Sequence, residues 1–190
     1  MSEQGRHLEY LAERIGGTHH KASGKHAERV VATVQGYSVT LDTVRTPLFA
    51  THTRYRARFV APEPFAFRLS PPDFDTATTL RRTLGKAADV QIGVPYFDDK
   101  YLIEATDGAK MRQFLDDPVL RQQIGDLGKF YLELRTDKDF PANHRELRLL
   151  LTGKTEEIAR LQYLFDLMGI FLSRLEDLGC LSETVPLTSL

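Results

Sequence analysis

The chain has 190 residues, 42% of them hydrophobic and 27% charged, which is typical of one soluble globular domain. Its formal net charge of −1 favours neither a nucleic acid nor a membrane surface as a partner. The single cysteine, Cys180, excludes an internal disulfide, indicates a reducing compartment, and is interpreted as an inert thiol. Without a signal-like segment or a long uncharged apolar run, we expect a cytoplasmic protein with no membrane span.

The first 26 residues differ in pattern from the rest of the chain. Apolar residues at helical spacing over 8–15 predict a short amphipathic helix that ends at Gly16-Gly17. A polar stretch, 18–26, follows it. The histidines of that stretch invite a metal-site interpretation: His19, His20 and His26. Zinc sites take ligands at fixed short spacings from rigid elements, and no carboxylate or cysteine follows these histidines until Glu28. We therefore expect residues 1–26 to be a helix and a polar linker without a metal ion.

Residues 27–190 are predicted to form one α+β domain. Apolar and polar residues alternate in several short segments, which predicts strands at 30–34, 37–41, 49–61, 65–69, 90–92, 101–105, 130–134 and 147–151. Gln35-Gly36 separates the first two as a hairpin turn. Short connections of this kind indicate a mainly antiparallel sheet with one packed face and one wet face.

A long C-terminal helix, Thr155–Leu178, is the strongest pattern in the chain. Its apolar residues recur at steps of three and four, so this helix and others are expected to pack on one face of the sheet. Thr152 or Thr155 is expected to cap its start, and Gly179 to end it. Other helices are predicted from Asp73 or Asp75 to Leu84, and from Asp107 and Asp117-Pro118 onward.

No motif for catalysis or for a cofactor passes a spacing test. The string Thr152-Gly153-Lys154-Thr155 ends like a phosphate-binding loop, but Arg148 stands where the first glycine of that motif belongs. Three pairs of acids fall at turns or helix starts, where aspartate accepts backbone hydrogen bonds: Asp73/Asp75, Asp98/Asp99 and Asp116/Asp117. We expect no catalytic residue, cofactor site or metal site, although an enzyme of unrecognised type remains an alternative.

One strand carries a row of basic residues. His52, Arg54, Arg56 and Arg58 alternate with apolar residues and would share one strand face, about 7 Å apart, with Arg68 on a neighbouring strand. This row could bind an anionic ligand or a nucleic-acid backbone. Tyr55 and Phe59 point to the other face and cannot stack bases there, so nucleic acid is the less favoured partner. A solvated face paired with acids such as Asp42 is the favoured interpretation.

The second half of the chain resembles a bacterial family of unknown function. The resemblance lies in Phe97-Asp98-Asp99-Lys100-Tyr101 through Leu134, read as the Phe-Asp start of a strand, a helix pair and a further strand. The segments Leu161–Leu167 and Leu172–Leu175 are similar to the last helix of that family. Family members often carry membrane segments, which this chain lacks. The resemblance implies no activity and no functional residues, and it lowers the expectation of an enzyme.

The leading hypothesis from the sequence is a non-catalytic binding or interaction domain that binds a protein partner or a second copy of itself. An anionic-ligand or nucleic-acid binder using the basic row is the second hypothesis. An enzyme is the third, and it would require a pocket with a buried acid or histidine whose pKa is shifted.

Overall fold

The computed structural model describes residues 3–24, 27–45, 50–72, 74, 88–136 and 141–184. Its first half contains α1 (Glu3–Arg14), β1 (Thr18–His20), β2 (Arg29–Val34), β3 (Tyr37–Arg45), β4 (Thr51–Val60) and β5 (Phe67–Ser70). Its second half contains β6 (Ala88–Asp89), α3 (Pro95–Asp98), β7 (Leu102–Ala105), α4 (Gly108–Phe114), α5 (Pro118–Gly125), β8 (Phe130–Arg135), β9 (His144–Thr152), α6 (Ile158–Asp177) and β10 (Glu183–Thr184).

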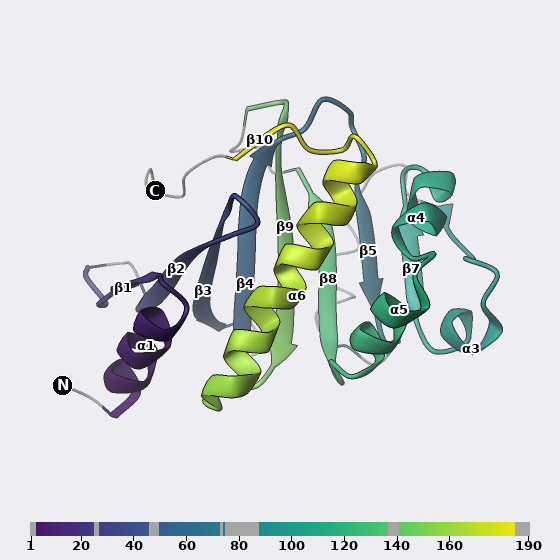
Figure 1. Cartoon of the computed structure of the whole chain (residues 1–190). Helices are drawn as coiled ribbons and strands as arrows, with labels where there is room; N and C mark the ends of the chain where they lie inside the picture. Colours follow the sequence, from purple (N-terminus) through teal and green to yellow (C-terminus); the bar gives the residue numbers. More distant parts are fainter. Residues whose placement is uncertain are drawn as a thin grey trace.

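The described strands pair in one antiparallel sheet, in the order β1-β2-β3-β4-β9-β8-β5-β7-β6, and β10 pairs with the end of β4. The helices α1, α4, α5 and α6 lie on one face of this sheet, and α6 crosses its middle (Figure 1). The predicted α+β class, with a mainly antiparallel sheet, helices on one face and a long C-terminal helix, is therefore confirmed.

Several turns and helix starts follow directly from local sequence. Gln35 and Gly36 both have positive φ, +53° and +83°, as a two-residue hairpin turn between β2 and β3 requires. The Asp107 carboxylate accepts hydrogen bonds from two amides of α4, and Asp117 does the same for α5, which begins at Pro118. These predicted caps are confirmed.

The core lies between α6 and the sheet. Apolar side chains of β3, β4, β8 and β9 are buried there against the apolar face of α6, and burial of each large one contributes about 2 kcal/mol. Tyr55 on β4 shows the fit most clearly. Its hydroxyl donates to the Leu161 carbonyl over 2.9 Å, and its ring meets Phe165 edge-on, with ring centroids 5.0 Å apart. This contact fixes which face of β4 points toward the helices.

Other predictions about the fold need correction. Thr18–His20 is not linker but strand β1, paired with Thr18 opposite Val31 and His20 opposite Arg29. The short strand expected at 90–92 lies instead at Ala88–Asp89. The helix α6 begins at Ile158 after Glu157, without a side-chain cap from Thr152 or Thr155. The predicted helix from Asp73 or Asp75 to Leu84 lies outside the described residues.

Candidate functional site

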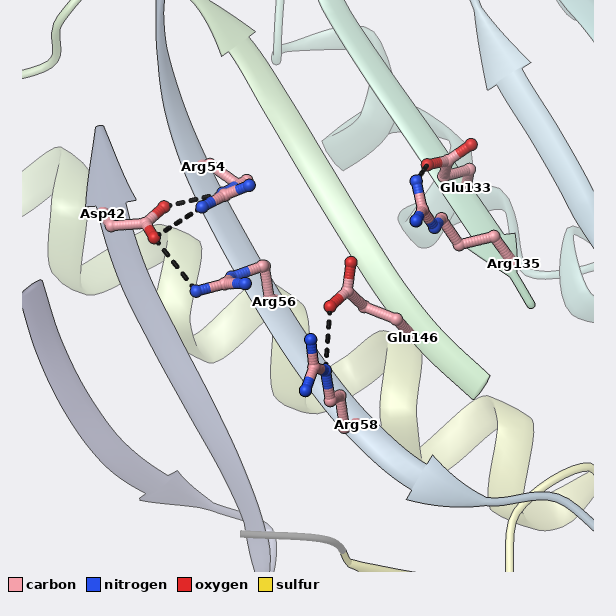
Figure 2. A network of polar contacts seen from close by, with 7 residues as sticks. All are labelled: Asp42, Arg54, Arg56, Arg58, Glu133, Arg135 and Glu146. Atoms are coloured by element: carbon pink, nitrogen blue, oxygen red, sulfur yellow. Dashed lines mark hydrogen bonds and ion pairs between the residues drawn. The ribbon is translucent and has the colours of Figure 1, made fainter. Parts of the chain in front are cut away.

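The candidate site is the face of the sheet opposite α6, here called the open face only because α1, α4, α5 and α6 lie on the other face. Side chains alternate along a strand, so the burial of Tyr55 under α6 turns Arg54, Arg56 and Arg58 toward the open face. Figure 2 shows these three arginines with Asp42 of β3, Glu146 of β9, and Glu133 and Arg135 of β8, while α6 lies behind the sheet. The same face carries Arg148 of β9, which stands opposite Arg56 and Glu133, and Arg68 of β5, opposite Glu133.

Asp42 holds two arginines at one end of this face. Arg54 binds its carboxylate in a bidentate manner, Nε to Oδ1 and Nη2 to Oδ2, both over 2.7 Å. Arg56 Nη2 donates to the same Oδ2 over 3.1 Å. Burial lowers the pKa of Arg54, but the hydrogen bonds and charge of Asp42 more than offset it, so that this pKa is raised. Burial and the neighbouring charge of Arg54 lower the pKa of Arg56. Asp42 thus stabilises the Arg54 cation better than the Arg56 cation.

Glu133 is the centre of a second group. It is 1% exposed, and its Oε2 accepts a hydrogen bond from the Tyr131 hydroxyl over 3.0 Å. Its Oε1 pairs with Arg148, and Arg68 and Arg135 approach its carboxylate oxygens to 3.9 and 3.8 Å. Burial, together with the charge of Glu133, raises the pKa of Tyr131. The Tyr131 phenol therefore stays protonated and serves as a donor to Glu133.

Two further ion pairs lie on this face of the sheet. Arg58 Nε donates to Glu146 Oε2 over 3.1 Å, and Arg68 Nη1 lies 3.5 Å from Glu104 Oε2. The predicted pairing of the basic row with acids on neighbouring strands is therefore present, but the row is not the expected solvated face, because its arginine side chains are only 5–19% exposed. In particular, Asp42 is the partner that the sequence indicated.

Two like charges stand next to each other in the middle of this face. Arg56 and Arg148 are direct partners across the β4–β9 pairing. Each donates to a carboxylate on its far side, Asp42 or Glu133, and each shares that carboxylate with other arginines. In the part of the chain that the structure describes, the buried Nε atoms of both side chains have no hydrogen-bond partner. The centre of the face therefore has unused donors and positive charge.

His52 lies in a different environment from the arginines. It is 2% exposed, and its ring centroid is 5.7 Å from that of Phe74, which in turn stacks on Tyr131. Leu150 and Val44 complete this small apolar cluster. The predicted basic row therefore changes character along β4: His52 packs in an apolar cluster, and only the arginines form ion pairs with acids. The apolar cluster was not predicted, because its members come from separate segments.

The other candidate residues have structural roles where they are described. Asp98 accepts hydrogen bonds from the backbone amides of residues 92–94, and Asp116 pairs with Arg174. His19 Nε2 lies 2.9 Å from Glu28 Oε1. Within the described ranges, no His, Cys, Asp and Glu side chains gather in a group of three that could hold a metal ion. Asp73, Asp75 and His26 lie outside those ranges.

The loop between β9 and α6 also has no cradle for a phosphate. Gly153 has φ +86° and exchanges backbone hydrogen bonds with β4, while the Thr155 amide donates to Thr53 Oγ1 over 2.8 Å. Lys154 pairs with Glu156. The sequence Gly-Lys-Thr therefore joins β9 to β4 and α6.

Comparison with protein-family models, with curated proteins and with solved structures finds no match to this chain. The family resemblance in the second half of the chain therefore stays a prediction. No helix in the described parts of the chain is long and apolar enough to cross a membrane.

Proposed function

We propose that this chain is a non-catalytic binding protein whose open sheet face holds a carboxylate of an acidic protein segment between Arg56 and Arg148. The observation that carries the proposal is the pairing of these two arginines directly across β4 and β9, each with a buried, unused Nε donor among the described residues. Both guanidinium groups are fixed by Asp42 and Glu133, so the site is formed before the ligand arrives.

Electrostatics favour an anion at this point. Like charges directly opposite in a sheet destabilise it, and their repulsion grows as burial removes water. The side chains of Arg56 and Arg148 are only 16% and 12% exposed, and burial lowers the pKa of Arg56. An added carboxylate would offset both charges and could accept charge-assisted hydrogen bonds from the exposed part of the two guanidinium groups.

The shape of the face favours an acidic peptide over a nucleic acid. Base stacking requires exposed aromatic rings beside the cations, but Tyr55 and Phe59 are buried under the helices. The small exposed fraction of the arginines suits a single carboxylate on a flexible side chain, which reaches into the surface more easily than a regular phosphate backbone.

The proposal is tested with a fluorescently labelled oligoglutamate peptide and the whole chain, by anisotropy at low and moderate salt. We expect saturable binding that weakens with salt, because exposed charge interactions are screened. Arg56→Gln and Arg148→Gln should each weaken binding about tenfold, since each removes a charge-assisted contact. Each substitution relieves the repulsion between the two arginines but also removes a partner of Asp42 or Glu133, so circular dichroism is used to verify that both variants are folded.

Arg160→Gln is the matched control. It removes the same charge from α6, where Arg160 donates to the Asp126 carbonyl, on the covered side of the sheet. An equal loss of affinity in Arg160→Gln, or full affinity in the double variant of Arg56 and Arg148, would overturn the proposal. Binding of an oligonucleotide that exceeds that of the peptide at equal charge would overturn the choice of ligand.

A further inference from the structure

A second candidate site lies on the side of the sheet that carries the helices, in a hollow of about 360 Å³ lined by residues of α4, of α5 and of the segment before α3. Ile92, Val94 and Leu115 supply its aliphatic lining, and Arg112, Asp116 and Arg121 its charged lining. The volume is within the range of sites for small ligands, roughly 300–1,000 Å³. An apolar wall with a few convergent polar groups is also typical of such sites.

The aliphatic wall is held rigidly. The Asp98 carboxylate accepts hydrogen bonds from the amides of Ile92, Gly93 and Val94 over 2.8, 2.9 and 3.0 Å. Gly93 adopts φ +82°, which lets the backbone turn around this carboxylate. Ile92 and Val94 are therefore fixed before any ligand binds, although they lie in a connection without regular structure.

Among the residues that the structure describes, each of the two arginines of the hollow is anchored by one hydrogen bond. Arg112 Nε donates to the Gln91 carbonyl over 3.1 Å, and Arg121 Nη1 donates to the Leu115 carbonyl over 2.5 Å. A guanidinium has five N–H donors, so each keeps others for a ligand. Arg121 Nε is buried and, within the described residues, has no hydrogen-bond partner.

The acid of the hollow is already paired. Asp116 binds Arg174 of α6, whose Nη2 also donates to the Gln113 carbonyl over 3.1 Å. The negative charge of Asp116 is thereby offset from outside the hollow. The remaining charge in the hollow is that of Arg112 and Arg121, so its charged groups favour an anion.

We infer that this hollow binds a small organic acid, with its carboxylate at Arg112 and Arg121 and its aliphatic chain against Ile92 and Val94. A planar guanidinium matches a carboxylate with two parallel hydrogen bonds, which favours a carboxylate over a spherical anion. The aliphatic wall favours an acid with a short hydrocarbon chain over acetate or phosphate. This inference does not depend on the open face.

The test uses the whole chain and hexanoate, with hexanamide as the uncharged analogue, followed by amide chemical shifts in NMR. Hexanoate is expected to shift the signals of residues 92–94 and 112–121 in a saturable manner, and hexanamide is not. Acetate should bind more weakly, because it lacks the chain that contacts the wall. Equal binding of hexanoate and hexanamide, or shifts spread evenly over the molecule, would contradict the inference.

Variants separate the charge of the hollow from its shape. Arg121→Gln and Arg112→Gln should each weaken hexanoate binding about tenfold. Because Arg112 is exposed, its variant should fold and can be measured even if Arg121→Gln does not fold. Asp116→Asn should bind hexanoate as tightly as the natural chain or more tightly, because it removes a negative charge that repels the carboxylate of hexanoate. Arg160→Gln, which removes a charge from α6 outside the hollow, should bind like the natural chain. Unchanged affinity in both arginine variants, or lost affinity in Asp116→Asn, would disprove the site.

Discussion

At the scale of single residues, Glu133 shows how much of the open face depends on one buried carboxylate. Arg148 pairs with it, Arg68 and Arg135 lie within 4 Å of it, and Tyr131 donates to it. Removing one partner of a buried ion pair leaves the other charges buried without compensation. Glu133→Gln keeps the side-chain shape but removes the charge. We expect it to lower the free energy of unfolding by about 3–5 kcal/mol, measured by urea denaturation.

Glu63→Gln provides the comparison for that variant. Glu63 pairs with Lys110 but is 55% exposed, so its pair should contribute at most about 0.5 kcal/mol. If Glu133→Gln proves no more destabilising than Glu63→Gln, the carboxylate does not hold the arginines in the way described.

Tyr37 on β3 links stability to alkaline pH. Its pKa is raised to about 12, mainly by burial and to a smaller extent by a hydrogen bond to Glu176 of α6 and the charge of that residue. In the unfolded chain a tyrosine titrates near pH 10, so the folded state favours the protonated phenol. This contribution is complete below about pH 10 and is lost as pH rises from there toward 12.

Tyr37→Phe removes the titrating hydroxyl, so the decline of stability above pH 10 should become shallower. Urea unfolding at pH 8, 10 and 11 gives the slope of unfolding free energy against pH for the natural chain and for the variant. Burial also raises the pKa of Tyr55 and Tyr131, and part of the decline should therefore persist in the variant. Parallel curves for the two proteins would show that Tyr37 does not contribute to the pH dependence.

At the scale of elements, α6 contacts the β2–β3 hairpin at a glycine. A Cβ on Gly169 would lie 2.6 Å from Val34 Cγ1, closer than side-chain atoms approach each other, and 3.1 Å from Gln35 Cγ, which is a tight contact. We expect Gly169→Ala to destabilise the protein by about 1–3 kcal/mol, because the helix and hairpin must move apart. Denaturation of the purified variant measures this directly.

The double variant Gly169→Ala with Val34→Ala identifies the contact. Shortening Val34 makes room for the new methyl group, so the double variant should be more stable than the sum of the single effects predicts. Additive effects would mean that the cost of the alanine arises elsewhere.

The elements that depend on neighbouring residues could be predicted from the sequence, and those that depend on distant ones could not. The Gln35-Gly36 turn, the Asp107 and Asp117 caps and the apolar stripe of α6 are local patterns, and all are present. Strand β1 has only three residues, two of them histidines, and exists because the backbone of β2 is available for pairing. The Thr155 amide is bound by Thr53 of β4, a contact between segments far apart in sequence.

The same distinction applies to the open face. Strand alternation alone placed Arg54, Arg56 and Arg58 together, and the adjacent hairpin brought Asp42 to them. Arg148, Glu133 and Glu146 belong to strands that pair with β4 or with each other only in the folded sheet. The repulsive pair at the centre of the site, Arg56 with Arg148, therefore could not be found from spacing in the sequence. The hollow beside α4 could not be found from spacing either, because it brings Ile92 and Val94 together with Arg112 and Arg121 from other segments of the chain.

At the scale of the whole molecule, stability should decrease from the middle of the sheet toward its edges. Strands β4, β9 and β8 are each paired on both sides and covered by α6, whereas β1 and β6 are short edge strands. In native-state hydrogen exchange, the amides of β9 should therefore exchange only on global unfolding. The free energy of opening measured for amides of β1 and β6 should be several kcal/mol lower. Protection of β1 equal to that of β9 would contradict this order.

The pairing of β4 with β9 has a consequence for biosynthesis. Tyr55 of β4 pairs with Leu149 of β9, which is synthesised much later. In a nascent chain, the edge of β4 that pairs with β9 therefore stays unpaired until most of the sequence has left the ribosome. Closing so long a loop is slow, and an exposed apolar strand edge invites aggregation in the meantime. A chain truncated after Pro141, which lacks β9, α6 and β10, should show no cooperative unfolding transition by circular dichroism. A cooperative transition in that fragment would mean that the first half of the sheet folds alone, and that a chaperone has less to protect during synthesis.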